Sequence, residues 1–355
     1  MDLNKIKKFY KNKKVFITGH TGFKGLWIFL ILKFLGAKVK GYSLPLNKND
    51  NFHFFKKIKK KYKKESIYGD VLDFKNLNKS IDKFKPHIVF HFAAQSLVIE
   101  SQKFPIKTLE VNVLGTYNII SSCFKNKSIK SLVIATSDKC YLNVGKSKKF
   151  YENSELGGVE PYSSSKAMCE QLINFYHSTI NYQKNFSLSS VRAGNVIGGG
   201  DFSDYRILPD IIKNYKKRKI ILRNPNHIRP WQHVLDVCLA YILIPIFHYK
   251  NRKKYSGPYN VGPSQKIKLN VLNLTKLFIK NLGYEFKIVK KKTKFIESKQ
   301  IFLETQKIKK FLNWKPLMNY GLSIKLTADW YKNYLKKKDI VKTTFYQINN
   351  YFNSL

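Results

Sequence analysis

The chain has 355 residues, of which 43% are hydrophobic and 25% charged, a composition that excludes a disordered or fibrous protein and is sufficient for a large core. The formal net charge is +44, but the lysines are spread along the chain without a groove-binding motif, so we expect no specific nucleic-acid partner. Four cysteines without metal-ligand spacing, and no apolar run long enough to cross a bilayer, favour a cytoplasmic protein without a metal or a membrane partner.

A buried strand and a glycine-rich turn open the chain. Residues 1–12 are basic but carry no signal-peptide pattern, and they lead into an apolar strand at residues 14–18. Three glycines with G-x-x-G-x-x-G spacing follow, and an apolar helix begins at Leu26. Glycine permits the tight turn and lets a pyrophosphate approach the helix N-terminus. We therefore predict a dinucleotide-binding segment that contains Gly19, Thr21, Gly22, Phe23, Lys24 and Gly25.

The second and third strands offer fewer contacts to a cofactor. Residues 37–42 predict the second strand, which ends with only Ser43 for the adenosine ribose and lacks the usual acidic residue. No arginine is available for a 2′-phosphate either, so the choice between NAD and NADP stays open here. Residues 67–73 predict the third strand. Within it, next to Val71, Asp70 accepts a hydrogen bond from the adenine amino group, caps the next helix, or does both.

The fourth and fifth strands bring polar and small residues to one edge of the predicted sheet. These strands are expected at residues 87–92 and 131–136, and the small residues after the first leave space for a cofactor. Gln95 is expected to contact both cofactor and substrate. The residues predicted at this edge are Ala93, Ala94, Gln95, Ser137, Asp138 and Lys139.

Tyr162 and Lys166 are four residues apart in a helix predicted over residues 162–180, so both side chains project from one face. A lysine ammonium close to a phenol favours the phenolate, which brings tyrosine into range as a base at neutral pH. Ser137 precedes Tyr162 at the distance typical of Ser/Tyr/Lys oxidoreductases, where the hydroxyl holds the substrate oxygen. Tyr162 and Lys166 are therefore predicted to contact both the cofactor and the reacting substrate.

The alternation of strands and helices weakens after a sixth strand at residues 186–191 and a glycine-rich loop at 192–201. The pattern predicts an α/β fold: a doubly wound parallel Rossmann sheet with a smaller C-terminal α/β substrate-binding lobe. Residues 1–194 are expected to bind NAD, and residues 195–355 to form the lobe, with segments that return to the first domain. The other predicted strands are 220–223 and 259–262, and the other helices are 105–124, 234–248, 269–282, 304–312, 322–335 and a short one within 47–64.

These motifs together resemble the extended short-chain dehydrogenase/reductase family over nearly the whole chain. Within that family the chain is most similar to the group of CDP-glucose 4,6-dehydratases. Four segments in the same order carry this narrower resemblance: 19–25, 136–141, 194–201 and 229–234.

The resemblance implies a redox-neutral dehydration that uses tightly held NAD. Tyr162 would take the proton of the sugar C4 hydroxyl as the hydride leaves for NAD, and water would then leave across C5 and C6. Asp138, held protonated, would donate to the departing C6 hydroxyl. Lys139 replaces the glutamate of related dehydratases, and it is either the C5 base or an ammonium that stabilises the enolate.

The resemblance also implies contacts to a CDP-glucose or a similar nucleotide sugar. Arg229 matches the arginine that binds the diphosphate, Asn195 would hold sugar or phosphate oxygens, and Arg223 is a further substrate contact. His233 is either a ligand contact or a packed core histidine. The family's habit implies a homodimer.

Two other functions compete with this interpretation. The first is a sister enzyme of the same fold, a dTDP-glucose or GDP-mannose dehydratase or an epimerase, although an epimerase needs no acid/base pair beside Ser137. The second is a basic binding protein that has kept the fold without turnover, and the intact set of Ser137, Tyr162 and Lys166 argues against it.

Overall fold

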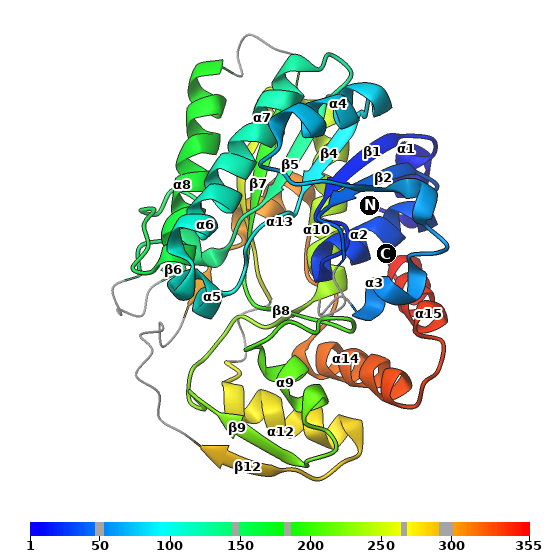
Figure 1. Ribbon diagram of the computed structural model, residues 1–355, viewed down its shortest axis with the longest axis vertical. Helices are drawn as coiled ribbons and strands as arrows, with labels where there is room; N and C mark the ends of the chain where they lie inside the picture. The colour runs from blue at the N-terminus through cyan, green and yellow to red at the C-terminus, as the bar shows by residue number, and fades with distance from the viewer. Residues whose placement is uncertain (47–52, 144–148, 181–185, 264–267, 291–300) are drawn as a thin grey trace.

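The protein is described by a computed structural model that covers residues 1–46, 53–143, 149–180, 186–263, 268–290 and 301–355. Its centre is a seven-stranded sheet in which all neighbouring strands are parallel (Figure 1). The predicted doubly wound parallel sheet is thereby confirmed. From one edge to the other, the strands are β11 (Gly257–Val261), β7 (Ser187–Ala193), β5 (Ser131–Ala135), β4 (Ile88–His91), β1 (Lys14–Thr18), β2 (Lys38–Ser43) and β3 (Ser66–Tyr68).

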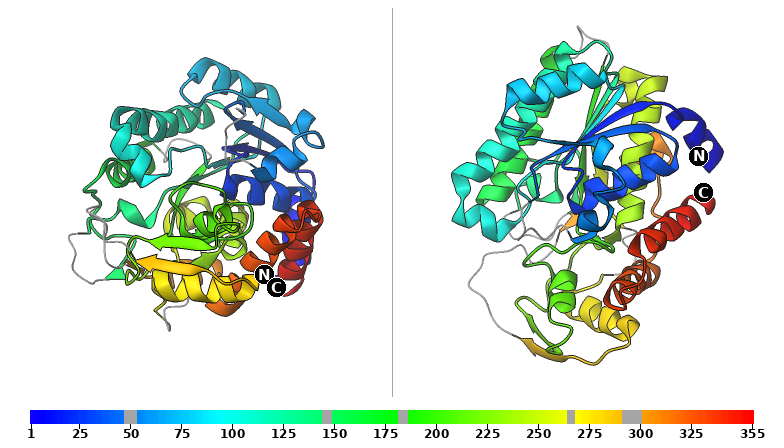
Figure 2. Two further views of the ribbon diagram at one scale, coloured as in Figure 1. Left: turned by 60° about the horizontal axis from the view of Figure 1, so that its bottom comes forward. Right: turned by 45° about the vertical axis from the view of Figure 1, so that its right-hand side comes forward.

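Helices cover both faces of this sheet, as the two views in Figure 2 show. The helices of the described residues are α1 (Leu3–Tyr10), α2 (Phe23–Phe34), α3 (His53–Ile58), α4 (Phe74–Phe84), α5 (Val98–Lys103), α6 (Pro105–Leu109), α7 (Gly115–Lys125), α8 (Pro161–Phe175), α9 (Ile207–Lys213), α10 (Val234–Lys250), α11 (Arg252–Tyr255), α12 (Val271–Leu282), α13 (Gln306–Leu312), α14 (Tyr320–Leu335) and α15 (Ile340–Asn353). Short 3₁₀ and π turns are η1 (Lys63–Glu65), η2 (Glu110–Leu114), η3 (Asp138–Cys140) and η4 (Tyr176–Ile180).

The alternation of side chains along each strand divides the core into two layers. In β1, Val15 and Ile17 face a large cluster that includes α2 and α10, while Phe16 faces a second cluster with α4, α7 and α8. Because strands buried on both faces must be apolar throughout, these strands consist of short uninterrupted apolar runs. No described helix is long and apolar enough to cross a membrane.

A smaller group of elements lies at the carboxyl end of the sheet, at the bottom of Figure 1. There α9 and α12 pack with a two-stranded sheet, and α14 packs against α12. The small parallel pairs of the structure are β9 (Lys219–Leu222) with β12 (Lys287–Lys290), β8 (Val196–Ile197) with β10 (Gln232–His233), and β6 (Lys149–Phe150) with β13 (Phe302–Leu303). The strand β11 and the helix α10, both far beyond residue 194, lie on the large sheet.

Several elements differ from the sequence-based expectation. The third strand stops at Tyr68, because the chain then turns, and Asp73, not Asp70, caps α4 by accepting from the backbone N–H of Asn76. The long helix expected at 105–124 is interrupted by the π turn η2. The helices α1 and α15 were not predicted, and of the basic segment 47–64 residues 47–52 lie outside the described residues.

Candidate active site

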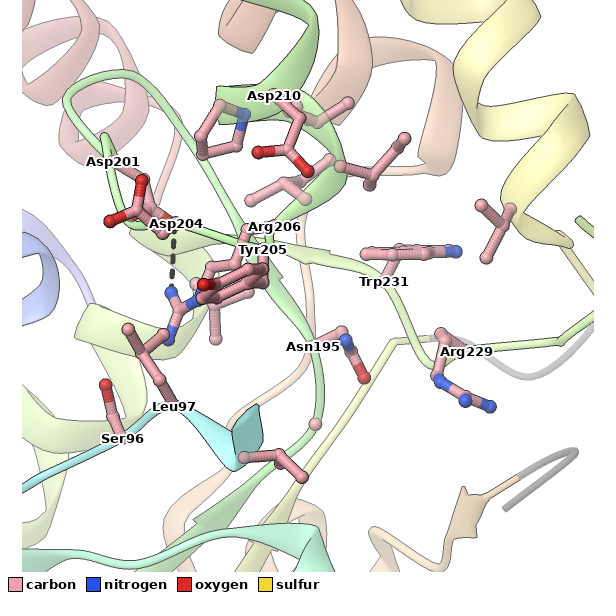
Figure 3. Close-up of a pocket in the computed structure, with 18 of the residues that line it drawn as sticks. Ser96, Leu97, Asn195, Asp201, Asp204, Tyr205, Arg206, Asp210, Arg229 and Trp231 are labelled. Atoms are coloured by element: carbon pink, nitrogen blue, oxygen red, sulfur yellow. Dashed lines mark hydrogen bonds and ion pairs between the residues drawn. The ribbon is translucent and has the colours of Figure 1, made fainter. Parts of the chain in front are cut away.

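The site lies at the point where the strand order reverses, since β1 is paired with β2 on one side and with β4 on the other. In parallel α/β sheets, ligands bind in the crevice at the carboxyl ends of the strands at such a switch point. A cavity of about 320 Å³ opens there, lined by residues that follow β1, β4, β5 and β7 and by residues of the smaller group (Figure 3). The same cavity therefore touches both halves of the chain.

The glycine turn has the shape of a phosphate cradle. Gly19 has a φ of +73°, and a Cβ on it would lie 2.6 Å from the backbone nitrogen of Ala93. A Cβ on Gly25 would lie 2.2 Å from the carbonyl oxygen of Gly19, so both positions require glycine. Gly22 caps α2 without a side-chain hydrogen bond, which leaves the first N–H groups of this twelve-residue helix open to an anion.

Buried positive charge accumulates beside this turn. Lys24 lines the cavity, and burial lowers the pKa of its ammonium to about 8, with Lys166 and Arg206 adding to the effect. Asp138 and Cys238 act in the opposite direction but do not offset it. A cluster of cations in a low-dielectric pocket is most stable with a bound anion, so this part of the cavity favours phosphate.

Ser137 and Tyr162 line the cavity, and Lys166 lies beside Tyr162 without lining it. Burial raises the pKa of the Tyr162 phenol to about 12, against a lowering effect of its hydrogen bond with Ser137. The Nζ atom of Lys166 lies 6.0 Å from the centroid of the Tyr162 ring and donates a hydrogen bond of 3.3 Å to the carbonyl oxygen of Ala135. Because burial holds the pKa of the Tyr162 phenol high here, its activation by Lys166 remains a prediction.

Asp138 is buried at the start of the 3₁₀ turn η3 that follows β5. Burial raises the pKa of its carboxyl, while the charge of Lys139 and a hydrogen bond of 3.0 Å from the Ser137 hydroxyl to Oδ1 lower it. The other oxygen, Oδ2, is buried without a hydrogen-bond partner in the described part of the chain. This carboxyl is thus suited to hold a proton and to donate it into the cavity, which Lys139 also lines.

Replacing Asp138 with asparagine is expected to raise the melting temperature more at about pH 8 than at about pH 4, by roughly 2 °C or more. The folded protein raises the pKa of the Asp138 carboxyl above its ordinary value of 3.8. The contribution of Asp138 to stability is therefore fully present below pH 3.8 and is lost as pH rises through the folded pKa. Thermal unfolding followed by circular dichroism measures the difference. Asp329→Asn on α14 is the control, and equal shifts at both pH values would contradict the assignment.

A buried ion pair supports the catalytic segments from behind. Arg192 on β7 and Glu170 on α8 form a salt bridge of 2.7 Å, and both side chains are almost fully buried. Glu170 also accepts hydrogen bonds from Thr136 and Ser190. Because Thr136 precedes Ser137 and Glu170 lies one turn beyond Lys166, the pair joins β5, β7 and α8 at fixed positions.

Several polar residues of the second half complete the cavity wall (Figure 3). Arg229 is buried, and its Nη2 lies 3.0 Å from the Nδ1 atom of His227. Arg206 forms a 2.8 Å salt bridge with Asp201 and acts electrostatically on Tyr162, although the two are far apart in sequence. Asn195 follows β7 and lines the same wall.

Comparison with known proteins identifies the family. The model of the GDP-mannose 4,6-dehydratase family matches residues 16–325. The chain belongs to this family. It is 36% identical over 356 residues to the CDP-glucose 4,6-dehydratase of Salmonella typhimurium, covering 98% of both chains. It is 30% identical over 275 residues to the dTDP-D-glucose 4,6-dehydratase of Dictyostelium discoideum, covering 72% of this chain and 59% of that protein.

Solved structures of this dehydratase and epimerase fold superpose well. An epimerase from Methanothermobacter thermautotrophicus gives a TM-score of 0.80 at 18% identity, covering 96% of this chain and 97% of that one. The dTDP-glucose 4,6-dehydratase of Bacillus anthracis, solved in complex with NAD, gives 0.74 at 23% identity, covering 92% and 98%. These likenesses establish the fold, and the predicted membership of the extended short-chain dehydrogenase/reductases is confirmed.

Only some of the site residues predicted from the sequence line the cavity. Those that line it are Phe23, Lys24, Ser137, Asp138, Lys139, Tyr162, Asn195, Arg223 and Arg229. His233 does not line it, because its ring is fully buried and caps α10 by accepting from the backbone N–H of Leu235, so it is a core histidine. Gln95 does not line it either, because its side chain bonds to Leu97 and Thr108.

The remaining predicted cofactor contacts do not line the cavity. The Ser43 hydroxyl bonds to the Nδ1 atom of His20 and accepts from the backbone N–H of Thr21. Asp70 accepts from the backbone N–H of Leu72, and the carbonyl of Val71 accepts from Asn118. Ribose and adenine contacts at Ser43 and Asp70 therefore remain predictions. The sequence interpretation missed Asp201, Arg206, Tyr205, Asp210, His227 and Trp231 on the cavity wall.

Proposed function

We propose that this protein is an NAD-dependent CDP-glucose 4,6-dehydratase, which converts CDP-D-glucose to CDP-4-dehydro-6-deoxy-D-glucose. The observation that carries the proposal is the buried Asp138 carboxyl, with its raised pKa, in one cavity with Tyr162 and Ser137. An epimerase has no need of an acid that expels the C6 oxygen, whereas a dehydratase has. The full-length likeness to a CDP-glucose 4,6-dehydratase supports the choice of substrate.

The residues around the glycine turn fit NAD. The uncapped N-terminus of α2 and the ammonium of Lys24 suit the pyrophosphate, and Gly19 carries no side chain at its close approach to Ala93. When bound, NAD would accept the hydride from the sugar C4 and return it to C6. The positive charge of a nicotinamide close to Tyr162 would also favour the phenolate.

The protein's own residues divide the proton transfers among them. Tyr162 removes the proton of the C4 hydroxyl, which Ser137 holds by a hydrogen bond. The resulting C4 ketone makes the C5 hydrogen acidic, and Lys139 either takes this proton or stabilises the enolate. Asp138 donates a proton to the C6 oxygen, which leaves as water, and C5 regains a proton when the hydride is returned to C6. Arg229 and Asn195 hold the diphosphate and the sugar, and Arg223 is a further contact to the nucleotide.

In this proposal the two halves of the chain bind different ligands. Residues 1–194 would bind the cofactor, and residues 195–355 would supply most substrate contacts. A cytoplasmic location is part of the proposal, since all four cysteines are free and buried, as expected for a reducing compartment.

The proposal further includes a homodimer. Large apolar side chains are exposed on α6, η2, α7 and α8, whose ribbons lie on the left side of Figure 1. The elements α6, η2 and α8 contact one another, and α7 contacts η2. Such a surface is typical of an interface between copies. Its exposed members are Ile106, Leu114, Tyr117, Met168 and Phe175.

The double variant Ile106→Glu/Met168→Glu is expected to sediment as a monomer, because it places charge at the centre of this apolar patch. Analytical ultracentrifugation of wild type and variant measures the mass. A wild-type monomer, or a dimer that the double variant leaves intact, would contradict the proposed interface. Ile221→Glu, at an exposed apolar residue on β9, is the matched control.

The function is tested by incubating the purified protein and NAD with CDP-glucose, dTDP-glucose and GDP-mannose in turn. We expect mass spectrometry to show the loss of one water from CDP-glucose. Loss of water from dTDP-glucose or GDP-mannose instead would reassign the substrate within the family. If all three sugars are recovered unchanged, the dehydratase assignment fails.

A further inference from the structure

One end of the cavity carries a polar pair whose role is not explained by the reaction chemistry. Asp210 on α9 and Arg223, directly after β9, both line the cavity. The charges that act on Asp210 are those of Arg223, Lys213, Asp204 and Asp201, whereas Arg206, Lys24, Lys139 and Arg229 act on Tyr162 and Asp138. The pair lies on α9 and directly after β9 in the smaller group, whereas Asp138 and Tyr162 lie on η3 and α8 beside the large sheet. Figure 3 shows Asp210 across the cavity from Ser96 and Leu97.

The hydrogen-bonding capacity of this pair is largely unused. Oδ2 of Asp210 lies 3.8 Å from Nη2 of Arg223, which is too long for a hydrogen bond. Among the described residues, no donor forms a hydrogen bond to the Asp210 carboxylate. Nη2 of Arg223 donates to the carbonyl oxygen of Tyr205, which leaves other guanidinium N–H groups for a ligand. Both side chains are about one-third exposed and reachable from the cavity.

The surroundings of the pair suit a flat heterocycle. Pro209, Leu222 and Val271 contribute apolar surface to this end of the cavity. If Arg229 holds the diphosphate, the hexose lies on the side of Tyr162 and the nucleoside on the side of α9 and β9. A planar ring there has apolar contacts on its faces and meets Asp210 and Arg223 at its edge.

We propose that Asp210 and Arg223 select cytosine, Asp210 by accepting a hydrogen bond from the N4 amino group and Arg223 by donating one to N3. This inference rests on the proposed function and names the residues that set its base specificity. Cytosine presents a donor at position 4 and an acceptor at N3, whereas uracil and thymine present an acceptor at position 4 and a donor at N3. A uracil or thymine ring would place its O4 acceptor against the Asp210 carboxylate and its N3 donor against the Arg223 guanidinium.

The raised pKa of Asp210, about 6, is compatible with this role. Burial raises it and Arg223 lowers it, so the carboxylate is mostly ionised at neutral pH and presents acceptors only. A site built to match a donor rejects a ligand that lacks that donor, because the buried acceptor is left without a partner.

The inference is tested by calorimetric binding of three nucleotides to the NAD-saturated protein. They are CDP, UDP and the diphosphate of the pyrimidin-2-one ribonucleoside, which is cytidine without its N4 amino group. Wild type is expected to bind CDP about tenfold or more tightly than either of the other two. In Asp210→Asn, whose amide has a donor as well as an acceptor, both ratios should fall by about tenfold. Asp204→Asn, which removes the same charge at a neighbouring residue paired with Lys213, should keep the wild-type ratios.

Specific outcomes would overturn the inference. Equal binding of CDP and the analogue by wild type would show that the amino group is not recognised, and this comparison does not depend on any variant folding. Unchanged ratios in Asp210→Asn would show that another group recognises it. Failure of the two proposals can be told apart: selective binding of CDP without dehydration refutes the enzyme assignment alone, whereas dehydration of CDP-glucose with unchanged ratios refutes the role of Asp210 alone.

Discussion

Replacing Tyr162 with phenylalanine is expected to lower kcat for dehydration by about 10²- to 10⁴-fold, with little change in the affinity for the nucleotide sugar. Phenylalanine keeps the ring but removes the oxygen that takes the C4 proton, so the first chemical step loses its base. Because the phenol carries a raised pKa in the protein, wild-type kcat/KM should also rise with pH, and this dependence should be absent in the variant. Steady-state kinetics across a pH series measures both effects.

A matched control for this variant is Tyr176→Phe. Tyr176 follows α8 in the turn η4 and lies away from the cavity, where its hydroxyl meets that of Ser121. The Tyr176→Phe variant should keep the wild-type turnover rate. If Tyr162→Phe retained more than about a tenth of the wild-type rate, Tyr162 would not be the base and the assigned chemistry would have to change.

Replacing Lys139 with alanine is expected to separate the two halves of the reaction. Oxidation at C4 requires Tyr162 and Ser137, which the change leaves in place, whereas loss of water requires removal of the C5 proton. We therefore expect water loss to slow by about 10²-fold or more, with oxidation still detectable. Rapid quenching and reduction with borodeuteride labels C4 wherever a ketone has formed, and mass spectrometry then distinguishes hexose with and without its C6 oxygen.

Lys149→Ala is the control for Lys139→Ala. Lys149 forms a salt bridge of 2.8 Å with Glu304 and does not line the cavity. Equal loss of oxidation and dehydration in Lys139→Ala would show that Lys139 maintains the structure of η3 and does not take part in the removal of the C5 proton.

The parts of the site that were predictable are those with a local cause. The glycine turn follows from a short-range requirement, because Gly19 and Gly25 admit no Cβ whatever the rest of the chain does. Likewise, four-residue spacing on a helix is enough to place Tyr162 and Lys166 on one face. The parallel sheet was predictable because its strands are short apolar runs alternating with helical segments.

The parts that were not predictable depend on contacts between distant segments. Arg206 acts on Tyr162 only because the fold brings these distant segments together. Likewise, the salt bridge between Glu170 and Arg192 joins a helix to a strand. The burial that raises the pKa of Tyr162 is also a tertiary property, which the spacing from Lys166 does not reveal. His233 was ambiguous for the same reason, since only the structure shows it enclosed beside Trp27.

The late position of β11 and α10 in the sequence constrains how the polypeptide matures on the ribosome. β11 pairs with β7, and α10 covers β5 and β7, so a nascent chain that ends at residue 194 exposes the apolar face of these strands. The first half therefore cannot complete its sheet until residue 261 has emerged from the exit tunnel. Prematurely terminated products should aggregate, and the cofactor-binding half should be recovered only from fragments that extend through β11.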